Sequence, residues 1–254
     1  MSLKPLYLVQ TGTDGHILNQ GCYTAFYAAK SLGYPINTYR NEIDVLKYLE
    51  DRGEKICIGG IDTLRKIIDL LGCKQPEVHP PHIHLPNFVG REITEITLGE
   101  LRHNNIPAPY FIKPLVLDKA FTGYVVIYPD MDLIRLRSLP DDTKLLKSEV
   151  VKFVSEYRIF IHNKNIVSAK NYAGRYDIIP DFTKVQLAIE AYIDQKVAYS
   201  LDFGITDKGE TLLIEINDAF GIAPYGLEPT TYLKMLSARW NEIIKTKKEA
   251  IYNL

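Results

Sequence analysis

The sequence is poor in cysteine and carries almost no net charge, and both features narrow the function classes open to it. Its 254 residues contain three cysteines, Cys22, Cys57 and Cys73, with no Cys-x-x-Cys spacing. This pattern argues against a disulfide framework or a zinc knuckle and fits a reducing cytoplasm. Basic residues number 30 against 31 acidic ones, so no overall field favours nucleic acid or an acidic membrane. We therefore expect a cytoplasmic protein with neither of those partners.

Long apolar runs and the familiar phosphate-binding glycine motifs are also missing. No apolar stretch approaches the roughly 20 residues that span a bilayer, and residues 1–5 resemble neither a signal peptide nor a transit peptide. The chain contains no G-x-x-x-x-G-K-[ST] and no G-x-G-x-x-G, so neither a P-loop nor a dinucleotide fingerprint is predicted.

The first 75 residues alternate between strand and helix patterns. Short apolar strands are predicted at 6–10, 36–40 and 55–58, and amphipathic helices at 22–32, 43–50 and 61–71. Gly33 and Gly72 follow two of these helices, where glycine commonly ends a helix. Alternation at this spacing indicates a parallel sheet with crossover helices, an α/β unit of Rossmann-like type.

The pattern changes after a proline-rich stretch at 76–90, which we expect to be a linker on the surface. Beyond it the strands alternate apolar and polar residues, as antiparallel hairpins do, and helices are predicted at about 181–198 and 230–248. The strands are predicted at 111–113, 123–128, 149–151, 156–161, 166–170, 200–205 and 211–217. This part is α+β, so the chain combines two architectures.

One hairpin places two carboxylates opposite each other. A turn centred on residues 208–209 pairs Asp202 with Glu215 and Ser200 with Asn217 on one face, because side chains alternate along a strand. Like charges directly opposite destabilise a sheet, so we expect a cation between them. Two carboxylates and an amide oxygen suit magnesium. The alternative is a solvated polar face whose carboxylates point into water.

The preceding hairpin places two cations opposite each other. A three-residue turn at 163–165 pairs Arg158 with Lys170, with Glu156 and Tyr172 on the same face. Two adjacent cations indicate a bound anion, most simply a polyphosphate. The alternative is that Glu156 is their structural partner.

A third signal is a lysine, Lys113, at the end of an apolar strand. It requires a counter-anion or access to water. A short loop follows, from Lys119 to Gly123, whose backbone amides could approach a phosphate.

Taken in order, these segments resemble an ATP-grasp domain. The matching pieces are Phe-Ile-Lys-Pro at 111–114, the loop at 119–123, Ser-Glu-Val-Val at 148–151, Glu-Tyr-Arg at 156–158 with Lys170, and Asp202 with Glu-Ile-Asn at 215–217. The stretch 148–160 followed by 168–170 is similar to a divergent clade of this family that is named after its arginines and lysine. That clade includes the eukaryotic translation-initiation-factor assembly proteins, and its bacterial and phage members are the nearest in appearance.

The resemblance implies a Rossmann-like pre-ATP-grasp domain at 1–105 and a two-lobed ATP-grasp unit at 106–254, with lobes at about 106–151 and 152–254. It implies ATP and Mg²⁺ as cofactors. Arg158 and Lys170 would act on the transferred phosphoryl group, and the metal ligands would be Asp202, Glu215 and Asn217. The implied ATP contacts are Lys113, Lys119, Gly123, Glu149, Val150, Val151, Glu156 and Arg158, with the backbone of 149–151 holding the adenine.

The family chemistry is attack of a carboxylate on ATP to give an acyl phosphate, which an amine or related nucleophile then captures. The two substrates are not identified by the sequence, and a protein or peptide is one candidate. Phe220, Gly221 and Tyr225, in the loop after the metal strand, are predicted to face the acceptor, and the loop at 11–15 is a second candidate. The alternative for the two aromatic residues is that they pack under the loop. The alternative function is a non-catalytic ATP-binding assembly factor.

The run His-Pro-Pro-His-Ile-His at 79–84 carries three histidines. An extended conformation would let His82 and His84 point the same way. Histidine is a common zinc ligand, but no fourth ligand stands out nearby, so the motif alone does not predict a metal site.

Overall fold

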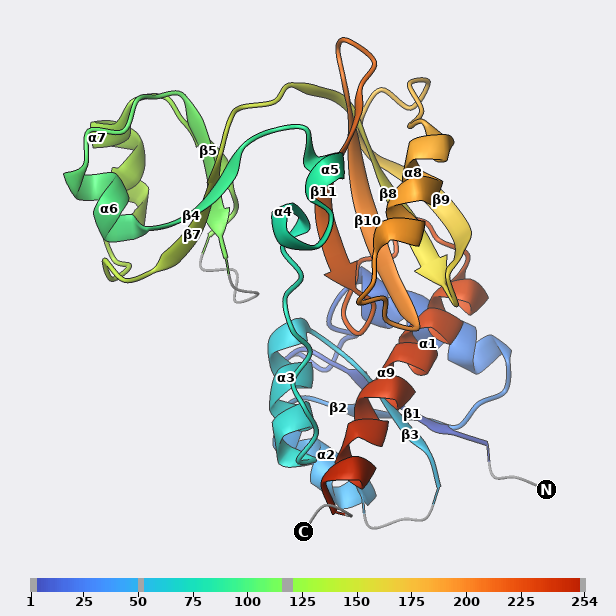
Figure 1. Cartoon of the computed structure of the whole chain (residues 1–254). Helices are drawn as coiled ribbons and strands as arrows, with labels where there is room; N and C mark the ends of the chain where they lie inside the picture. The colour runs from blue at the N-terminus through green and yellow to red at the C-terminus, as the bar shows by residue number, and fades with distance from the viewer. Residues whose placement is uncertain (1–3, 50–52, 116–120, 252–254) are drawn as a thin grey trace.

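A computed structural model describes residues 4–49, 53–115 and 121–251. Its first part is a parallel sheet of order β2-β1-β3 with crossover helices (Figure 1). The elements are β1 (Leu6–Gln10), α1 (Gln20–Ser31), β2 (Ile36–Tyr39), α2 (Glu42–Leu49), β3 (Lys55–Ile58) and α3 (Ile61–Leu70). The predicted α/β unit is confirmed, and each of these elements lies within two residues of its predicted position.

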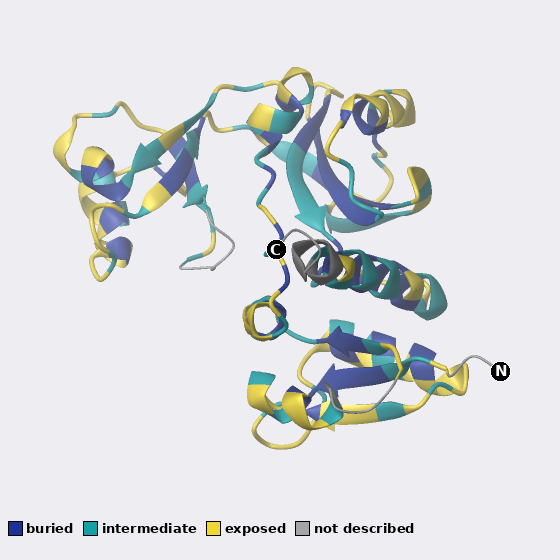
Figure 2. Cartoon of the chain, turned by 60° about the horizontal axis from the view of Figure 1, so that its bottom comes forward, coloured by how far each residue is buried: buried dark blue, intermediate teal, exposed yellow. Residues whose placement is uncertain are grey.

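The core of this parallel sheet is completed by the far end of the chain. Helix α9 (Pro229–Ile251) packs against α1 and β3. Its Trp240 is buried and donates from Nε1 to the carbonyl of Lys55 at 2.9 Å. Figure 2 shows the buried residues concentrated on the strands and on the helix faces turned toward them. A three-stranded sheet is too narrow to bury its apolar face alone, so α9 supplies the missing cover.

The proline-rich stretch is not the surface linker that the sequence predicts. It contains α4 (Pro81–His84) and α5 (Pro86–Val89), both in contact with β11. Leu85, between them, is buried in the core of the second part. Arg91 donates to the carbonyl of Leu213 at 3.0 Å. Proline at the first position of each short helix fixes the backbone without preventing apolar side chains from packing, so the segment is partly helical and partly buried.

The second part contains an antiparallel sheet of order β11-β10-β8-β9, whose core includes residues of α8 (Phe182–Ala191). Its strands are β8 (Phe153–His162), β9 (Asn165–Gly174), β10 (Ala198–Thr206) and β11 (Thr211–Asp218). The two predicted hairpins form, β8 with β9 and β10 with β11, and β8 also pairs with β10. This last pairing joins the two hairpins into one sheet, which we call the β8–β11 sheet.

The predicted registers hold at the charged positions and fail beyond them. Asp202 faces Glu215, but a bulge after Asp202 places Leu213 rather than Ile214 opposite Phe203. Arg158 faces Lys170, while a second bulge between Phe160 and Ile161 shortens the turn to two residues. Asn163 and Lys164 form that turn with φ of 50° and 64°, so the predicted three-residue turn is wrong. Bulges shift a register by one residue and are not encoded by alternation.

A smaller antiparallel sheet of order β4-β7-β5-β6, the β4–β7 sheet, forms a separate lobe (Figure 1). Its strands are β4 (Ile93–Thr97), β5 (Tyr110–Pro114), β6 (Tyr124–Val126) and β7 (Lys144–Ser148). Helices α6 (Leu98–His103), α7 (Pro129–Asp132) and the short 3₁₀ helix η1 (Leu133–Leu136) complete it. The pattern did not predict β4 or α6.

Two details of this lobe bear on the expected boundaries. Residues 149–151, predicted as a strand, form the connection between β7 and β8 instead, so that prediction is wrong. Strand β4 pairs with β7, which favours a boundary before residue 93, although the division at 105 stays a prediction. Within the described residues, no helix has the length and apolar character needed to cross a membrane.

Candidate functional site

A cavity of about 440 Å³ lies where the β4–β7 sheet faces the β8–β11 sheet. Residues of both sheets and of the loop after β11 line it. Those that matter for its chemistry are Lys113, Gly123, Arg158, Tyr172, Asp202, Glu215, Asn217, Phe220, Gly221 and Tyr225. Most of the predicted site residues are therefore brought together in one place.

A row of four charged residues crosses the β8–β11 sheet beside this cavity. Successive strand pairings place Lys170 opposite Arg158, Arg158 opposite Asp202, and Asp202 opposite Glu215. Directly opposite residues point to the same face of a sheet. The row therefore runs from two cations to two anions, with opposite charges meeting at its centre.

Arg158 and Asp202 form the buried centre of the row. The guanidinium donates from Nε to Asp202 Oδ1 at 2.8 Å and from Nη2 to Oδ2 at 2.7 Å, and both residues are at most 6% exposed. Burial raises the pKa of Asp202, an effect that Arg158 opposes. Burial alone would lower the pKa of Arg158, but the contacts with Asp202 raise it. Asn217 adds a hydrogen bond from its amide nitrogen to Asp202 Oδ2 at 3.3 Å.

A second ion pair joins the two sheets across the cavity. Lys113, on β5, lies 3.1 Å from Oε1 of Glu215, on β11. Burial would raise the pKa of Glu215, but Lys113, Arg158 and Asn217 together lower it below its ordinary value. Gly123 allows the chain to pass close to Lys113, because a Cβ there would lie 3.0 Å from Cβ of Lys113 and 2.6 Å from the ring of Phe111.

These pairs correct the expectation that each like-charge pair needs an external counter-ion. The two hairpins face each other through β8 and β10, so Arg158 neutralises Asp202, and Lys113 neutralises Glu215. The alternative that Glu156 is the partner of Arg158 is also wrong. Glu156 instead accepts a hydrogen bond from the Tyr172 hydroxyl at 2.8 Å.

Two stacked tyrosines form one wall of the cavity. The rings of Tyr172 and Tyr225 lie 4.9 Å apart at 17°, and the Arg158 guanidinium lies 4.7 Å from the centre of the Tyr225 ring. Tyr225 has φ of 42°, a conformation that is rare for a non-glycine residue. No role for Tyr172 is predicted from the sequence, although its place on the same strand face as Lys170 is the available signal.

In the loop after β11, the alternative that the aromatic residues pack under the loop holds for Phe220 and not for Tyr225. Phe220 is 4% exposed and belongs to the core around the parallel sheet, whereas Tyr225 is 38% exposed. A Cβ on Gly221 would lie 2.6 Å from Ile61, so glycine is needed where this loop meets the start of α3. Phe220 and Gly221 also line a second cavity of about 330 Å³, together with residues 19–22 and 58–62. The loop at 11–15 is not among the described residues that line either cavity.

The remaining predicted residues lie at the margins or outside the described chain. Lys119 falls outside the described residues. Lys170 belongs to the charged row but is not among the described residues that line the cavity. In the segment 149–151, the carboxylate of Glu149 accepts from the amide of Glu92 at 3.0 Å. Val150 and Val151 make no backbone hydrogen bond within the described part of the chain, so their amides and carbonyls are available to a ligand.

The oxygen atoms of Glu215 and Asn217 suit a magnesium ion, whereas those of Asp202 are already shared with Arg158. Glu215 and Asn217 line the cavity, the Glu215 side chain is 41% exposed, and Asn217 uses its amide nitrogen toward Asp202, which leaves its oxygen as a ligand. Carboxylate and amide oxygens are the ligands that magnesium takes. Both oxygens of Asp202 already accept from Arg158, so Asp202 can coordinate only while sharing them.

Comparison with known proteins gives one family. Residues 88–235, more than half of the chain, match the ATP-grasp domain family described as family 2 of the clade named after two arginines and one lysine. No curated protein sequence gives a significant match.

Solved structures share the fold over nearly the whole chain. A D-alanine–D-alanine ligase from Bacillus anthracis complexed with ATP is 12% identical and covers 99% of both chains, with a TM-score of 0.58. An L-amino acid ligase from Bacillus licheniformis is 11% identical over 94% of this chain and 76% of its own, with a TM-score of 0.59. A RimK domain ATP-grasp protein from Sphaerobacter thermophilus is 12% identical over 96% and 98%, with a TM-score of 0.57.

Proposed function

Because the chain belongs to this arginine- and lysine-named clade of the ATP-grasp domains, we propose that it is a magnesium- and ATP-dependent ligase that joins a carboxylate to an amine or a related nucleophile. The observation that carries this proposal is the ion pair between Lys113 and Glu215 at the cavity between the two antiparallel sheets. It brings a phosphate-binding cation and a metal-binding carboxylate within 3.1 Å at one point. A triphosphate with its magnesium would exchange this pair for two new ones.

The proposed reaction has two steps. A carboxylate oxygen of the first substrate attacks the γ-phosphorus of ATP, the bond to the β-phosphate oxygen breaks, and ADP leaves with that electron pair. The amine of the second substrate then attacks the acyl carbon, inorganic phosphate leaves, and the amine loses a proton. Neither step needs a protein nucleophile, so positioning and charge stabilisation are the contributions required of this chain.

Each predicted residue has a place in this scheme. Lys113 and Lys119 bind the α- and β-phosphates, and Arg158 and Lys170 stabilise the transferred phosphoryl group. The backbone of 149–151 holds the adenine edge, chiefly through the groups of Val150 and Val151 that make no backbone hydrogen bond within the described residues. Magnesium held by Asp202, Glu215 and Asn217 would neutralise charge on the phosphates. Gly123 and Glu156 complete the proposed ATP contacts. Gly123 lets the backbone approach the nucleotide closely, and Glu156 acts through the Tyr172 hydroxyl that it binds.

The substrates meet at the shared edge of the two cavities. Phe220 and Gly221 line both, and Tyr225 stands with Tyr172 beside Arg158. An acceptor placed there would have an aromatic wall on one side and the γ-phosphate on the other. The second cavity is lined partly by residues around the first turns of α1 and α3. We propose that it receives the acceptor, for which a peptide terminus or a side chain of a protein is a candidate.

We include a cytoplasmic location in the proposal because all three cysteines are buried thiols.

Thermal unfolding with and without ATP and magnesium tests the nucleotide site. A ligand at 100 times its dissociation constant stabilises a protein by about 2.7 kcal/mol, which at this chain length raises the midpoint by roughly 5–10 °C. We expect this rise for the wild type only when both ligands are present, and we expect Glu215→Gln to lose it. The matched control is Glu210→Gln, an exposed carboxylate at the turn of the same hairpin, which should keep the full rise. An equal rise in Glu215→Gln would contradict the metal assignment.

ADP release, measured with a panel of carboxylates and amines, separates the ligase from the alternative. A non-catalytic ATP-binding assembly factor would show the thermal rise without ADP release. The observation that favours this second function is the commitment of Arg158 to Asp202, since a guanidinium bonded twice to a carboxylate is less available to the γ-phosphate.

A further inference from the structure

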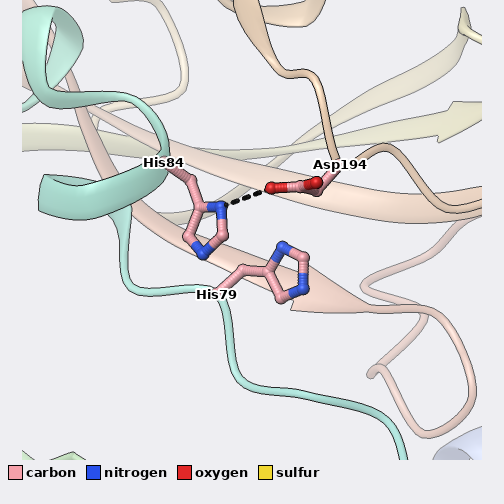
Figure 3. A group of neighbouring side chains, drawn as sticks. All are labelled: His79, His84 and Asp194. Atoms are coloured by element: carbon pink, nitrogen blue, oxygen red, sulfur yellow. Dashed lines mark hydrogen bonds and ion pairs between the residues drawn. The ribbon is translucent and has the colours of Figure 1, made fainter.

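Two histidines of the proline-rich segment meet an aspartate from a distant part of the chain. His79 and His84 lie on either side of residues 80–83, and Asp194 lies in the turn between α8 and β10. One ring nitrogen of each histidine and one carboxylate oxygen of Asp194 lie within 4.8 Å of one another. Figure 3 shows the Asp194 carboxylate directed at His84, with the His79 ring beside it. His82, between the two histidines in the sequence, is not part of this cluster.

The contacts within the cluster hold the side chains in place. Nδ1 of His84 lies 3.1 Å from Oδ2 of Asp194, and the two imidazole rings stack 4.2 Å apart at 14°. The Tyr192 hydroxyl lies 2.6 Å from Nδ1 of His79. Hydrogen bonds of this kind fix the ring orientation of metal-binding histidines.

His79 is the buried member of the cluster, at 7% exposed. Burial, Lys196 and His84 lower the pKa of its ring to about 4, and the charges of Asp194 and Asp218 oppose this lowering. Lys196 is the unfavourable neighbour, and the carboxylate of Asp194 offsets its charge.

We propose that His79, His84 and Asp194 form a binding site for a divalent transition-metal ion of the zinc class, with water as the fourth ligand. Two imidazoles and one carboxylate are a common protein ligand set for zinc. Bonds of about 2.1 Å in a tetrahedron place ligand atoms roughly 3.4 Å apart, so atoms that lie within 4.8 Å of one another must close by at most about 1.4 Å. The more exposed members, His84 and Asp194, with side chains 20% and 56% exposed, are the ones that turn.

The ion fastens the segment between α3 and β4 to the turn between α8 and β10. His84 and Asp194 are 110 residues apart in the chain, so one ion closes a long loop and stabilises the folded state. His79 also lines a small cavity together with Asn217 and Asp218, which places the site behind the strand that carries Glu215. The inference does not depend on the proposed function, because no nucleotide takes part in it.

Metal binding to the full chain, without an affinity tag and after chelation, tests the site. Zinc is titrated in millimolar magnesium, which occupies the oxygen-ligand site, and cobalt serves as the spectroscopic probe of ligand type. We expect one zinc per chain and a rise of about 5–10 °C in the unfolding midpoint at 100 times the dissociation constant. His84→Gln and Asp194→Asn should each weaken zinc at least about 10-fold. The control His82→Gln, on the same short helix, should bind as the wild type does.

Three results would overturn the site. The first is no stoichiometric zinc binding by the wild type. The second is unchanged affinity in both His84→Gln and Asp194→Asn. The third is a cobalt spectrum with thiolate charge-transfer bands, which would assign the metal to a cysteine instead. Asp194 is exposed, so loss of binding in Asp194→Asn cannot be attributed to a failure to fold, and an unfolding curve of the metal-free variant checks this.

Discussion

Two arginines of this chain bind an aspartate in nearly the same way and in different surroundings. Arg158 bonds Asp202 at 2.8 and 2.7 Å, and Arg239, on α9, bonds Asp218 at 2.8 and 2.6 Å. Both guanidiniums are about equally buried, at 6% and 5% exposed. Judged by the pair alone, the two could have the same role.

Their neighbours differ. Arg158 lines the cavity beside Tyr225 and lies in a row whose outer members, Lys170 and Glu215, have like-charged neighbours. Arg239 has a second carboxylate, Glu242, at 2.8 Å, and Glu242 in turn accepts from the amide of Val197. The second network also reaches that cavity, through Asp218, but Arg239 is not among the described residues that line it. A buried ion pair is therefore a candidate ligand contact where its cation itself lines the cavity, as Arg158 does.

Replacing each arginine gives the largest expected change in the unfolding midpoint and separates the two networks most clearly. Arg239→Met and Arg158→Met each leave a buried carboxylate without its partner, which costs about 3–5 kcal/mol and lowers the unfolding midpoint by roughly 6–20 °C. Only Arg158→Met should also lose the rise produced by ATP and magnesium. The measurement is thermal unfolding with and without both ligands.

The controls for this comparison are an exposed pair and two double variants. Arg175→Met removes the exposed pair with Asp177 and should leave the midpoint unchanged, because surface pairs contribute little. Replacing both partners by apolar residues, as in Arg239→Met with Asp218→Leu, should recover much of the lost stability. The corresponding double variant of Arg158 and Asp202 should recover stability but not the response to ATP. If Arg239→Met also loses that response, the two networks are not separate.

Acid should weaken the two sides of β11 in different pH ranges. Burial, Lys196 and His84 lower the pKa of His79 to about 4, although the charge of Asp218 raises it. The pKa of this histidine in the unfolded chain is about 6.5. The unfolded chain therefore takes up the proton first, and this contribution to stability is lost as pH falls from about 6.5 to 4. The pKa of Glu215 is lowered in the folded protein, although burial opposes this. The carboxylate therefore stabilises the fold above its unfolded pKa of about 4.3, and this stabilisation is lost as the pH falls below that value.

Unfolding midpoints in metal-free buffer at pH 7.5, 5 and 4 check these ranges. His79→Gln, which can keep a hydrogen bond to Tyr192, should flatten the decline between pH 6.5 and 4 by a few degrees. Lys113→Met, which removes the cation beside Glu215, should change only the decline at lower pH. Identical pH profiles for the wild type and His79→Gln would show that His79 titrates normally.

The smallest expected effect concerns the aromatic wall that distinguishes the Arg158 site. Tyr225→Leu removes both the stack on Tyr172 and the ring under the Arg158 guanidinium, each worth about 0.5–1.5 kcal/mol. We expect a fall of roughly 2–12 °C in the midpoint for the two contacts together, while Tyr225→Phe, which keeps the ring, should match the wild type. A normal midpoint in Tyr225→Leu would mean that the wall contributes to ligand binding alone or not at all.

Local pattern was enough to predict the elements that depend on neighbours in the chain. Alternating strands and helices with glycine stops gave the parallel sheet, and period-two alternation placed Arg158 with Lys170 and Asp202 with Glu215 on one face. These features follow from interactions within one hairpin or one crossover. The bulges after Asp202 and Phe160, and the burial of the proline-rich segment, depend on packing that alternation does not encode.

The sequence by itself determined which charges line up, and tertiary structure decided which of them meet. The bond between Arg158 and Asp202 spans 44 residues and exists because β8 lies beside β10, while Lys113 reaches Glu215 because the two antiparallel sheets face each other. The cover that α9 gives the parallel sheet and the contact of His84 with Asp194 also join residues far apart in the chain. A turn fixes the register of the strands that it joins, but pairing between distant strands is set by burial of their apolar faces, which many arrangements of one pattern can satisfy.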